Sequence, residues 1–320
     1  MSENEKVTIE TLNALKRESD KWTKVGVTVL VLVFVVPLLY VLTVFMVSNA
    51  SRSANAASSF FRVAGFSGLV VFVILALFIF VVVAVFMMVT KRSRYRMAYK
   101  ALFSHRVLSG LLEEYHYAHR EGIPKAALKE IGMVRLGNIY RSEDCVSGCH
   151  RDVGFIQADL TIQDEYTDSD GDTHTVTYFN GRWLVFEFPR RFVTKLAVVG
   201  GGCRQAVHAR GMEKFATESI EFNSRFDVYM QDGVEMFYLL DPKMIEIMQA
   251  LSDKYGGKIL FLFADKKLHI GINDNTDSFE PPRGQKGDLD EGEEVRRLAD
   301  EFRTVFELAD KLELHKNIFK

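Results

Sequence analysis

Two long stretches near the start of the chain contain no charged residue. The first lies between Lys24 and Arg52, and the second runs from residue 63 to residue 90. A membrane-spanning helix needs about 20 consecutive apolar residues, because each residue rises about 1.5 Å across a hydrocarbon core of about 30 Å. We therefore predict two transmembrane helices, at residues 25–47 and 66–89, that form a hairpin.

The composition of the first stretch fits lipid better than water. Pro37 lies in its middle, and valine, a weak helix former in water, is abundant. Inside lipid the backbone finds hydrogen-bond partners only within a helix, so such a segment is helical and tolerates proline. A cleaved signal peptide would be shorter and nearer the N-terminus. Helices in the core of a soluble protein are seldom apolar on every side over this length.

Most of the positive charges near the two stretches lie before the first one and after the second one, and few lie between them. Cytoplasmic flanks of membrane helices carry an excess of Lys and Arg. We therefore expect residues 1–24 to be a cytoplasmic segment, residues 48–65 an external loop, and both termini cytoplasmic. The charges are Lys16, Arg17, Lys21 and Lys24 before the first stretch, Lys91, Arg92, Arg94 and Arg96 after the second, and only Arg52 and Arg62 between them.

From Lys91 onward the chain is well charged and nearly neutral, with 33 Lys and Arg against 37 Asp and Glu. This balance is not the charge pattern of a nucleic-acid-binding surface, so we expect no nucleic acid partner. We predict a cytoplasmic domain at residues 90–281, a polar linker at 282–292 and an amphipathic C-terminal helix at 293–320. The three cysteines are an odd number, which favours reduced thiols.

The domain changes from helical to alternating patterns along its length. Apolar residues recur at helical spacing from Arg94 to about Arg120. Later strands are joined by tight turns, which predicts an α+β domain with a mainly antiparallel sheet. The expected strands are 156–162 with one face buried, 173–179, 183–188, 192–199, a hairpin over 226–240 and a hairpin turning at Asp265-Lys266; Asn180-Gly181 is read as a turn or bulge, and Asp241-Pro242 as the start of a helix.

Several of these segments resemble a bacterial family catalogued as domain of unknown function 3137 (DUF3137). The segments are "YKALF", "YRSEDCVSG", "DSDGDTHTVTYFNGRWLVFEF", "YLLDPKMIEIM", "KILFLFADKKLHIGI" and "DSFEP". The resemblance covers roughly residues 99–281 and the membrane hairpin, and leaves out the last helix. It implies a multi-pass protein of the bacterial inner membrane, with LemA-type membrane proteins as candidate partners from gene neighbourhood. It brings no established activity, cofactor or catalytic residue.

One set of thiols and imidazoles has the chemistry of a metal site. Cys145, Cys149 and His150 are close in sequence, and Cys203 and His208 follow further on. Such ligands suit zinc, but the spacing is not that of a zinc knuckle. We expect structural thiols and name no metal ligand.

An acidic segment at Asp168-Ser169-Asp170-Gly171-Asp172 resembles a calcium loop at first sight. An EF-hand loop needs Gly at its sixth position and Glu at its twelfth. Counted from Asp168, these positions hold Thr173 and Phe179. We therefore expect an acidic hairpin turn.

No catalytic motif is present in the sequence. Gly200 to Gly202 lack the Lys-Ser/Thr of a phosphate loop, and there is no G-x-S-x-G, H-E-x-x-H or kinase set. We name no catalytic or cofactor-binding residue. The leading hypothesis is a membrane-anchored, non-catalytic module that binds a protein or ligand in an envelope assembly. A membrane-tethered enzyme and a Cys/His metal-responsive regulator remain alternatives, and the oligomeric state is left open.

Overall fold

The computed structural model describes residues 8–50, 56–187, 192, 194–231, 239–282, 284–285 and 287–311. The chain divides into two compact units. The first comprises Met1–Leu102 and Pro281–Glu291, and the second comprises Phe103–Glu280 and Gly292–Lys320.

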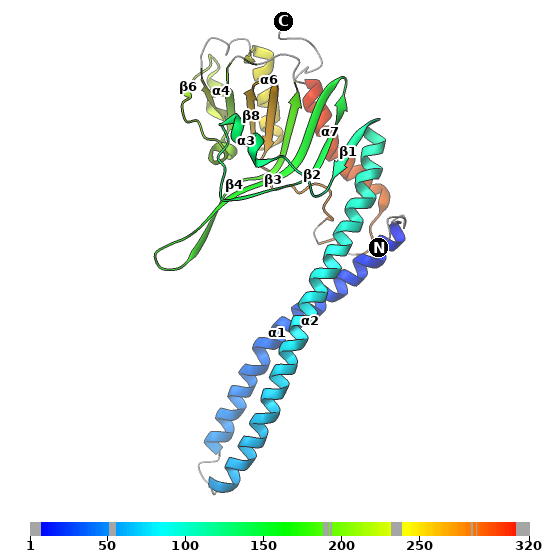
Figure 1. Ribbon diagram of the computed structural model, residues 1–320, viewed down its shortest axis with the longest axis vertical. Coiled ribbons are helices and arrows are strands. Elements are labelled where there is room, and N and C mark those ends of the chain that lie inside the picture. The colour runs from blue at the N-terminus through cyan, green and yellow to red at the C-terminus, as the bar shows by residue number, and fades with distance from the viewer. Residues whose placement is uncertain are drawn as a thin grey trace. The chain divides into compact units, whose positions relative to one another are not determined.

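Two long helices make up most of the first unit (Figure 1). They are α1 (Ile9–Ala50) and α2 (Ala56–Leu111), which continues into the second unit. The helices run antiparallel, because Glu18 of α1 forms an ion pair with Lys91 of α2 at 2.7 Å while Gly26 faces Met88. α1 continues through Pro37 without a break.

Many of the apolar side chains described on both helices are exposed. Among the described residues, one helix, Leu75–Leu111, is long and apolar enough to cross a membrane. The predicted spans fall partly on side chains outside the described residues, namely 36, 37, 40 and 43–47 in the first span and 66–71, 73 and 74 in the second. The expected external loop overlaps residues 51–55, which also lie outside the described part, while α2 already begins at Ala56.

The second unit is built on a nine-stranded sheet, within the part of the chain that the structure describes. The strand order is β1-β2-β3-β4-β9-β8-β5-β7-β6, and the strand pairs in it are antiparallel, which confirms the predicted α+β domain. The strands are β1 (Tyr115–Ala118), β2 (Ile139–His150), β3 (Val153–Thr167), β4 (Thr173–Glu187), β5 (Leu196–Gly200), β6 (Glu213–Phe215), β7 (Phe226–Met230), β8 (Ile259–Ala264) and β9 (Lys267–Ile272).

Helices cover both faces of this sheet (Figure 1). On one face, Leu128 and Ile131 of α3 (Lys125–Ile131) share a buried cluster with Leu160 and Trp183. On the other lie α6 (Pro242–Lys254) and α7 (Glu291–Lys311). Phe306 of α7 packs against a β3 ring, with 6.0 Å between ring centroids. Two shorter helices complete the unit, the 3-10 helix η2 (Gly201–Ala206) and α4 (Ile220–Arg225).

Strand β3 is buried on both faces, which differs from the prediction. The alternating residues of β3 were predicted to bury one face only, and that face is buried. Gln157 and Asp159 on the opposite face are also buried. The reason is that the loop after β9 covers Asp159, through hydrogen bonds from Ser278.

Two segments differ from their predicted structure. The helix expected to reach about Arg120 ends at Leu111, because the following Tyr115–Ala118 segment pairs with the edge of β2 instead. In the hairpin expected at 226–240, β7 is present and pairs with β5 and β6, whereas residues 232–238 lie outside the described part.

The remaining turns and helix starts follow the prediction. The Asp241 side chain accepts a hydrogen bond from the Met244 amide at 2.7 Å and caps α6. Asp265 adopts a left-handed conformation in the β8–β9 turn. The buried side chains of α7 include Leu298 and Phe302, so this stripe packs on its own domain.

Asn180 and Gly181 form neither a turn nor a bulge. They stay in register with β3, and the extra residue of the bulge is Tyr178, because Ile162 pairs with Phe179 while Gln163 pairs with Thr177. Gly181 is needed for another reason. A Cβ atom on it would lie 2.1 Å from the backbone oxygen of Ile272.

We predict that Gly181→Ala lowers the free energy of unfolding by about 3 kcal/mol, because the strand backbone has to move to relieve the overlap. The measurement is chemical unfolding of the full chain in detergent, followed by the fluorescence of buried Trp183. Gly110→Ala is the control, since a Cβ there meets nothing within 4 Å and alanine favours a helix by up to about 1 kcal/mol. Equal stability of both variants would contradict this packing.

Candidate functional site

The cysteine and histidine set is spread over the domain. Cys203 is buried in the core beside α3, and burial raises its pKa to about 12. Cys145 is half-buried on β2, where burial also raises its pKa, and Cys149 is exposed. His150 contacts α7, with its Nε2 3.0 Å from an Asp310 oxygen. The backbone amide of His208 donates to the Met133 carbonyl oxygen at 2.8 Å, and the His208 residue is exposed.

Among the described residues, one group of three possible metal ligands lies within 4.8 Å, and it contains no cysteine. It consists of Glu143, Asp144 and Asp277. Among the described residues, the thiols and imidazoles considered in the sequence form no such group.

The acidic segment forms the turn of a long hairpin (Figure 1). The Asp168 carboxylate accepts hydrogen bonds from the amides of Asp170 and Asp172, at 3.0 and 2.9 Å. Its second oxygen lies 2.7 Å from His174 Nε2. The hydrogen bond from His174 and those from the backbone lower the pKa of Asp168. Both oxygens of the Asp168 carboxylate therefore have hydrogen-bond partners within the hairpin, as expected for an acidic hairpin turn.

The hairpin extends beyond the neighbouring strands. β2 pairs with β3 only as far as Gln163, and β9 pairs with β4 only from Arg182 onward. Residues 164–176, which we call the β-arm, pair with each other alone among the described strands. The β-arm carries no Lys or Arg and five carboxylates: Asp164, Glu165, Asp168, Asp170 and Asp172.

The base of the β-arm is held firmly. The Asn138 side chain accepts from the Glu165 amide at 2.9 Å and donates to the Glu165 carbonyl oxygen at 2.7 Å. The two oxygens of Asp164 accept from the Asn138 amide and from the Tyr178 hydroxyl, both at 2.7 Å. The Arg135 guanidinium lies over the Tyr178 ring at 4.9 Å. These contacts fix the direction in which the β-arm projects.

The outer part of the β-arm presents an aromatic pair beside the carboxylates. Tyr166 and His174 are cross-strand partners and their rings stack, with centroids 5.4 Å apart. Tyr166 is 54% exposed. A π-face next to carboxylates is suited to contact a cation, such as an arginine or lysine side chain.

Sequence reasoning found the acidic turn and missed the β-arm. The signal was available, because residues 163–175 contain no aliphatic side chain, whereas the parts of β3 and β4 on either side of them are rich in apolar residues. Such a segment has nothing to bury and therefore extends into solvent. The supporting roles of Asn138 and Tyr178 had no local signal, since Asn138 lies 26 residues from Asp164.

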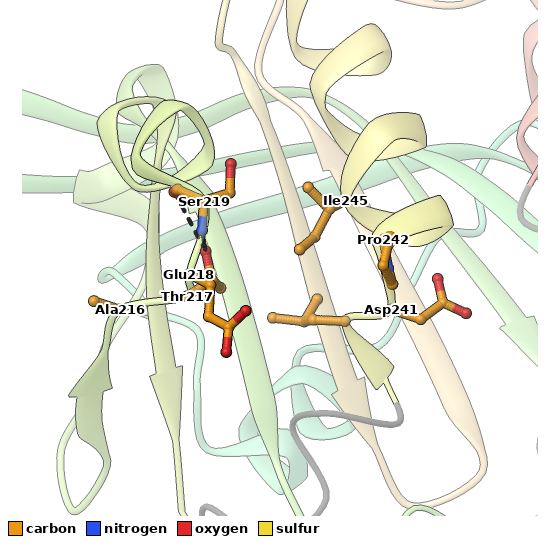
Figure 2. A pocket seen from close by; sticks show the side chains of 8 residues that line it. Ala216, Thr217, Glu218, Ser219, Asp241, Pro242 and Ile245 are labelled. Carbon is orange, nitrogen blue, oxygen red and sulfur yellow. Dashed lines mark hydrogen bonds between the residues drawn. The ribbon is translucent and has the colours of Figure 1, made fainter.

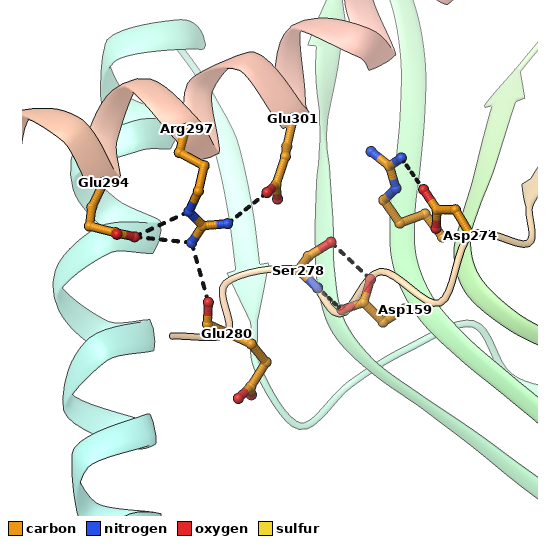
Figure 3. Close-up of polar contacts among 8 residues, drawn as sticks. Asp159, Asp274, Ser278, Glu280, Glu294, Arg297 and Glu301 are labelled. Atoms are coloured by element: carbon orange, nitrogen blue, oxygen red, sulfur yellow. Dashed lines mark hydrogen bonds and ion pairs between the residues drawn. The ribbon is translucent and has the colours of Figure 1, made fainter. Parts of the chain in front are cut away.

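A second polar site is buried between β2, β3 and the loop after β9. The Ser278 amide and hydroxyl donate to the two oxygens of Asp159, the hydroxyl at 2.8 Å (Figure 3). Burial, followed by the nearby charge of Asp144, raises the pKa of Asp159 well above its ordinary value. The Tyr117 hydroxyl donates to Asp144 at 2.6 Å, and burial raises the pKa of Tyr117. This site joins the strands to the loop and opens on no described hollow.

Ion pairs fasten α7 beside this region (Figure 3). The Arg297 guanidinium lies between Glu294 and Glu301, and it also donates to the carbonyl oxygen of Glu280. Burial raises the pKa of Glu301. On β4, the Arg182 guanidinium donates to Asp274 at 2.6 Å. The hydrogen bond from Arg297 to Glu280 ties α7 to the loop after β9, so these ion pairs have a structural role.

A hollow of about 470 Å³ in the second unit lies between the starts of α4 and α6 (Figure 2). Its lining combines apolar side chains with two carboxylates, from Glu218 and Asp241. The side chains of Ser219 and Asp241 cap these helices. They accept hydrogen bonds from the backbone amides of Phe222 and Met244, at 3.2 and 2.7 Å. The lining residues are Ala216, Thr217, Glu218, Ser219, Leu240, Asp241, Pro242 and Ile245, and they contain no histidine or cysteine.

The most perturbed histidine is also structural. His269 is 4% exposed, and its Nδ1 accepts a hydrogen bond from Trp183 Nε1 at 3.2 Å. Burial lowers its pKa to about 3, so it is neutral in the core. General acid–base catalysis needs a group that titrates near the working pH and reaches a substrate. His269 meets neither requirement, because burial lowers its pKa to about 3 and it is 4% exposed.

We predict that Asp159→Asn removes a pH-dependent loss of stability. The folded protein holds the Asp159 proton more tightly than the unfolded chain, so the free energy of unfolding falls as the pH rises from about 4 through the raised pKa. Asparagine mimics the protonated acid, because it can accept from the Ser278 amide and donate to its hydroxyl. Above the raised pKa, the free energy of unfolding of the variant should exceed that of the wild type by about 1.4 kcal/mol for each unit by which folding raises the pKa.

The measurement is unfolding between pH 4 and 7, and Asp164→Asn is the control. The hydrogen bond from Tyr178 lowers the pKa of Asp164, so the stability it contributes is present at neutral pH and is lost as the pH falls. The two variants should therefore deviate from the wild type in opposite directions at pH 7. Parallel curves for the wild type and Asp159→Asn would show that the buried acid is not held protonated.

Comparisons with known proteins give one family and one solved structure. No curated protein matches the chain. The crystal structure of the mycobacterial trehalose monomycolate transport factor A, TtfA, is similar with a TM-score of 0.39 and 11% identity, over 70% of this chain and 95% of that chain. The family model described as "Protein of unknown function (DUF3137)" matches residues 177–314.

This match differs in extent from the predicted resemblance. It includes α7, which we expected to lie outside, and it begins within β4, so the expected region from residue 99 to residue 176 is not part of it. The family itself is the predicted one. Residues 177–314 of the chain match the model of the DUF3137 family.

Proposed function

We propose that this chain is a membrane-anchored, non-catalytic binding protein whose β-arm docks a positively charged segment of another protein. The observation that carries the proposal is a hairpin with a rigid base and an exposed acidic surface. A partner with Lys and Arg on its surface has the complementary charge. LemA-type membrane proteins, named by the family resemblance, are the first candidates to test.

The anchor in this proposal is a two-helix membrane hairpin. Its support is the exposure of large apolar side chains on both helices, including Phe34 at 77% and Leu38 at 61% on α1, and Phe72 at 68% and Phe86 at 67% on α2. In water this surface would be a large unfavourable patch, whereas in lipid it needs no cover. The Lys and Arg distribution supports both termini in the cytoplasm of a bacterial inner membrane.

The β-arm fits a charged protein partner better than a small ligand. Its five carboxylates lie along a projecting ribbon, and the hollow of the domain is elsewhere. Exposed ion pairs contribute little individually, so several must act together. They mainly raise the association rate, and their effect decreases with salt. The stacked Tyr166 and His174 add a contact that survives at higher salt.

We predict that the triple variant Glu165→Gln, Asp170→Asn, Asp172→Asn loses partner binding without unfolding. The side chains of these residues make no hydrogen bond or ion pair within the described part of the chain, whereas Asp164 and Asp168 hold the β-arm together and are left unchanged. Three lost ion pairs of about 0.5 kcal/mol each weaken binding roughly tenfold at low salt.

The measurement is titration of the purified full chain in detergent with a purified LemA-type protein from the same genome. A matched control neutralises three exposed carboxylates elsewhere, in Glu113→Gln, Glu114→Gln, Glu130→Gln. The control should bind as the wild type does. If both triple variants bind alike, or if a crosslinker placed at Tyr166 captures no partner in cells, the β-arm is not the binding surface.

A further inference from the structure

A basic hollow lies in the first unit where α1 passes from polar to apolar sequence. Arg17, Lys21 and Lys24 are spaced by four and three residues, so they lie on one side of the helix, and the apolar run begins at Val25. The hollow has a volume of about 540 Å³. It is lined by Arg17, Asp20, Lys21, Lys24, Val25, Gly287 and Asp288.

One wall of the hollow is a segment from the far end of the sequence. The Arg17 guanidinium donates to both oxygens of Asp288, with Nε 3.0 Å from one of them. Lys16 Nζ donates to the Gly287 carbonyl oxygen at 2.5 Å. The Asn13 side chain accepts from the Leu289 amide at 2.8 Å and donates to its carbonyl oxygen at 3.4 Å. Residues 287–289, part of the predicted polar linker, are therefore hydrogen-bonded to α1.

Arg17 and Asp288 form an ion pair in the hollow, whereas its two lysines form none with the described residues. Asp288 is neutralised by Arg17, whose hydrogen bond lowers the pKa of Asp288. Lys21 and Lys24 are exposed and form no ion pair with any described residue. The nearby Lys91 of α2 is already paired with Glu18 at 2.7 Å. The two lysines are thus the cations in this hollow that are available to an anion.

We propose that this hollow binds the phosphate of an anionic phospholipid through Lys21 and Lys24. The inference rests on the membrane anchor proposed above, which puts the hollow at the level of the lipid headgroups. Ammonium groups are good partners for phosphate oxygens. Val25 continues the lining into the apolar surface of α1, where Val27 is 55% and Val31 is 56% exposed, so acyl chains can follow the phosphate. A free phosphate would make no use of that surface.

The test is retention of lipid by the purified full chain in nonionic detergent, measured by native mass spectrometry with added phosphatidylglycerol, phosphatidylcholine or inorganic phosphate. Lys21→Gln, Lys24→Gln should weaken phosphatidylglycerol retention about tenfold or more, since each lysine contributes about 1 kcal/mol near anionic lipid. Arg92→Gln, Arg94→Gln is the control, because it removes two exposed charges close to the same end of the helices but outside the hollow. It should retain the lipid as the wild type does.

Further variants and controls distinguish the possible explanations of a loss of lipid. Lys21→Arg, Lys24→Arg should restore retention, and all variants should unfold at the same temperature without lipid. Equal loss in the two glutamine variants would overturn the site, since only a general charge effect would remain. Competition by inorganic phosphate at matched concentration would overturn the lipid assignment. If the chain is released from membranes by alkaline carbonate without detergent, the anchor itself fails; if it stays inserted and the variants do not differ, only this inference fails.

Discussion

The outward-facing apolar side chains of α1 and α2 are the constraint on which the rest of the account depends. A phenylalanine such as Phe34, 77% exposed on a helix, has no protein surface to pack against. Two antiparallel helices held by Glu18–Lys91 and by the close approach of Gly26 to Met88 cannot cover these groups themselves. Lipid would solvate this surface and would also force the backbone into helix. The second unit would then be a body tethered to a membrane.

That body has a sheet covered by helices on both faces, and its candidate function lies in the β-arm, which extends beyond the neighbouring strands. Asp159 and Ser278 are buried and hydrogen-bonded to each other, and they hold the loop after β9 to β3. The β-arm leaves the covered region and keeps its direction because Asn138 and Tyr178 hold its base. Stiffness at the base and charge beyond it favour recognition of another protein over chemistry on a small molecule.

Much of this fold was readable in the sequence, because its signals are local. The alternation before Asp168, the capped helix at Asp241 and the turn at Asp265 each follow from a few neighbouring residues. Features that depend on distant partners were not readable. Nothing near Tyr115 shows that this segment pairs with β2, and nothing near Gly287 shows that it contacts α1. Closeness in sequence was also a poor guide for the thiols, because Cys145 is half-buried, Cys149 is exposed, and neither belongs to the group of possible metal ligands found among the described residues.

The most direct test of the membrane account is thiol accessibility in cells. Cys149 is exposed on the domain, and a cysteine at Ser58→Cys, in a Cys149→Ser background, reports on the predicted external loop. With a membrane-impermeant maleimide, the loop cysteine should react in cells whose inner membrane is intact, and Cys149 should react only after that membrane is opened. Reaction of Cys149 in intact cells, with no reaction at position 58, would contradict the account.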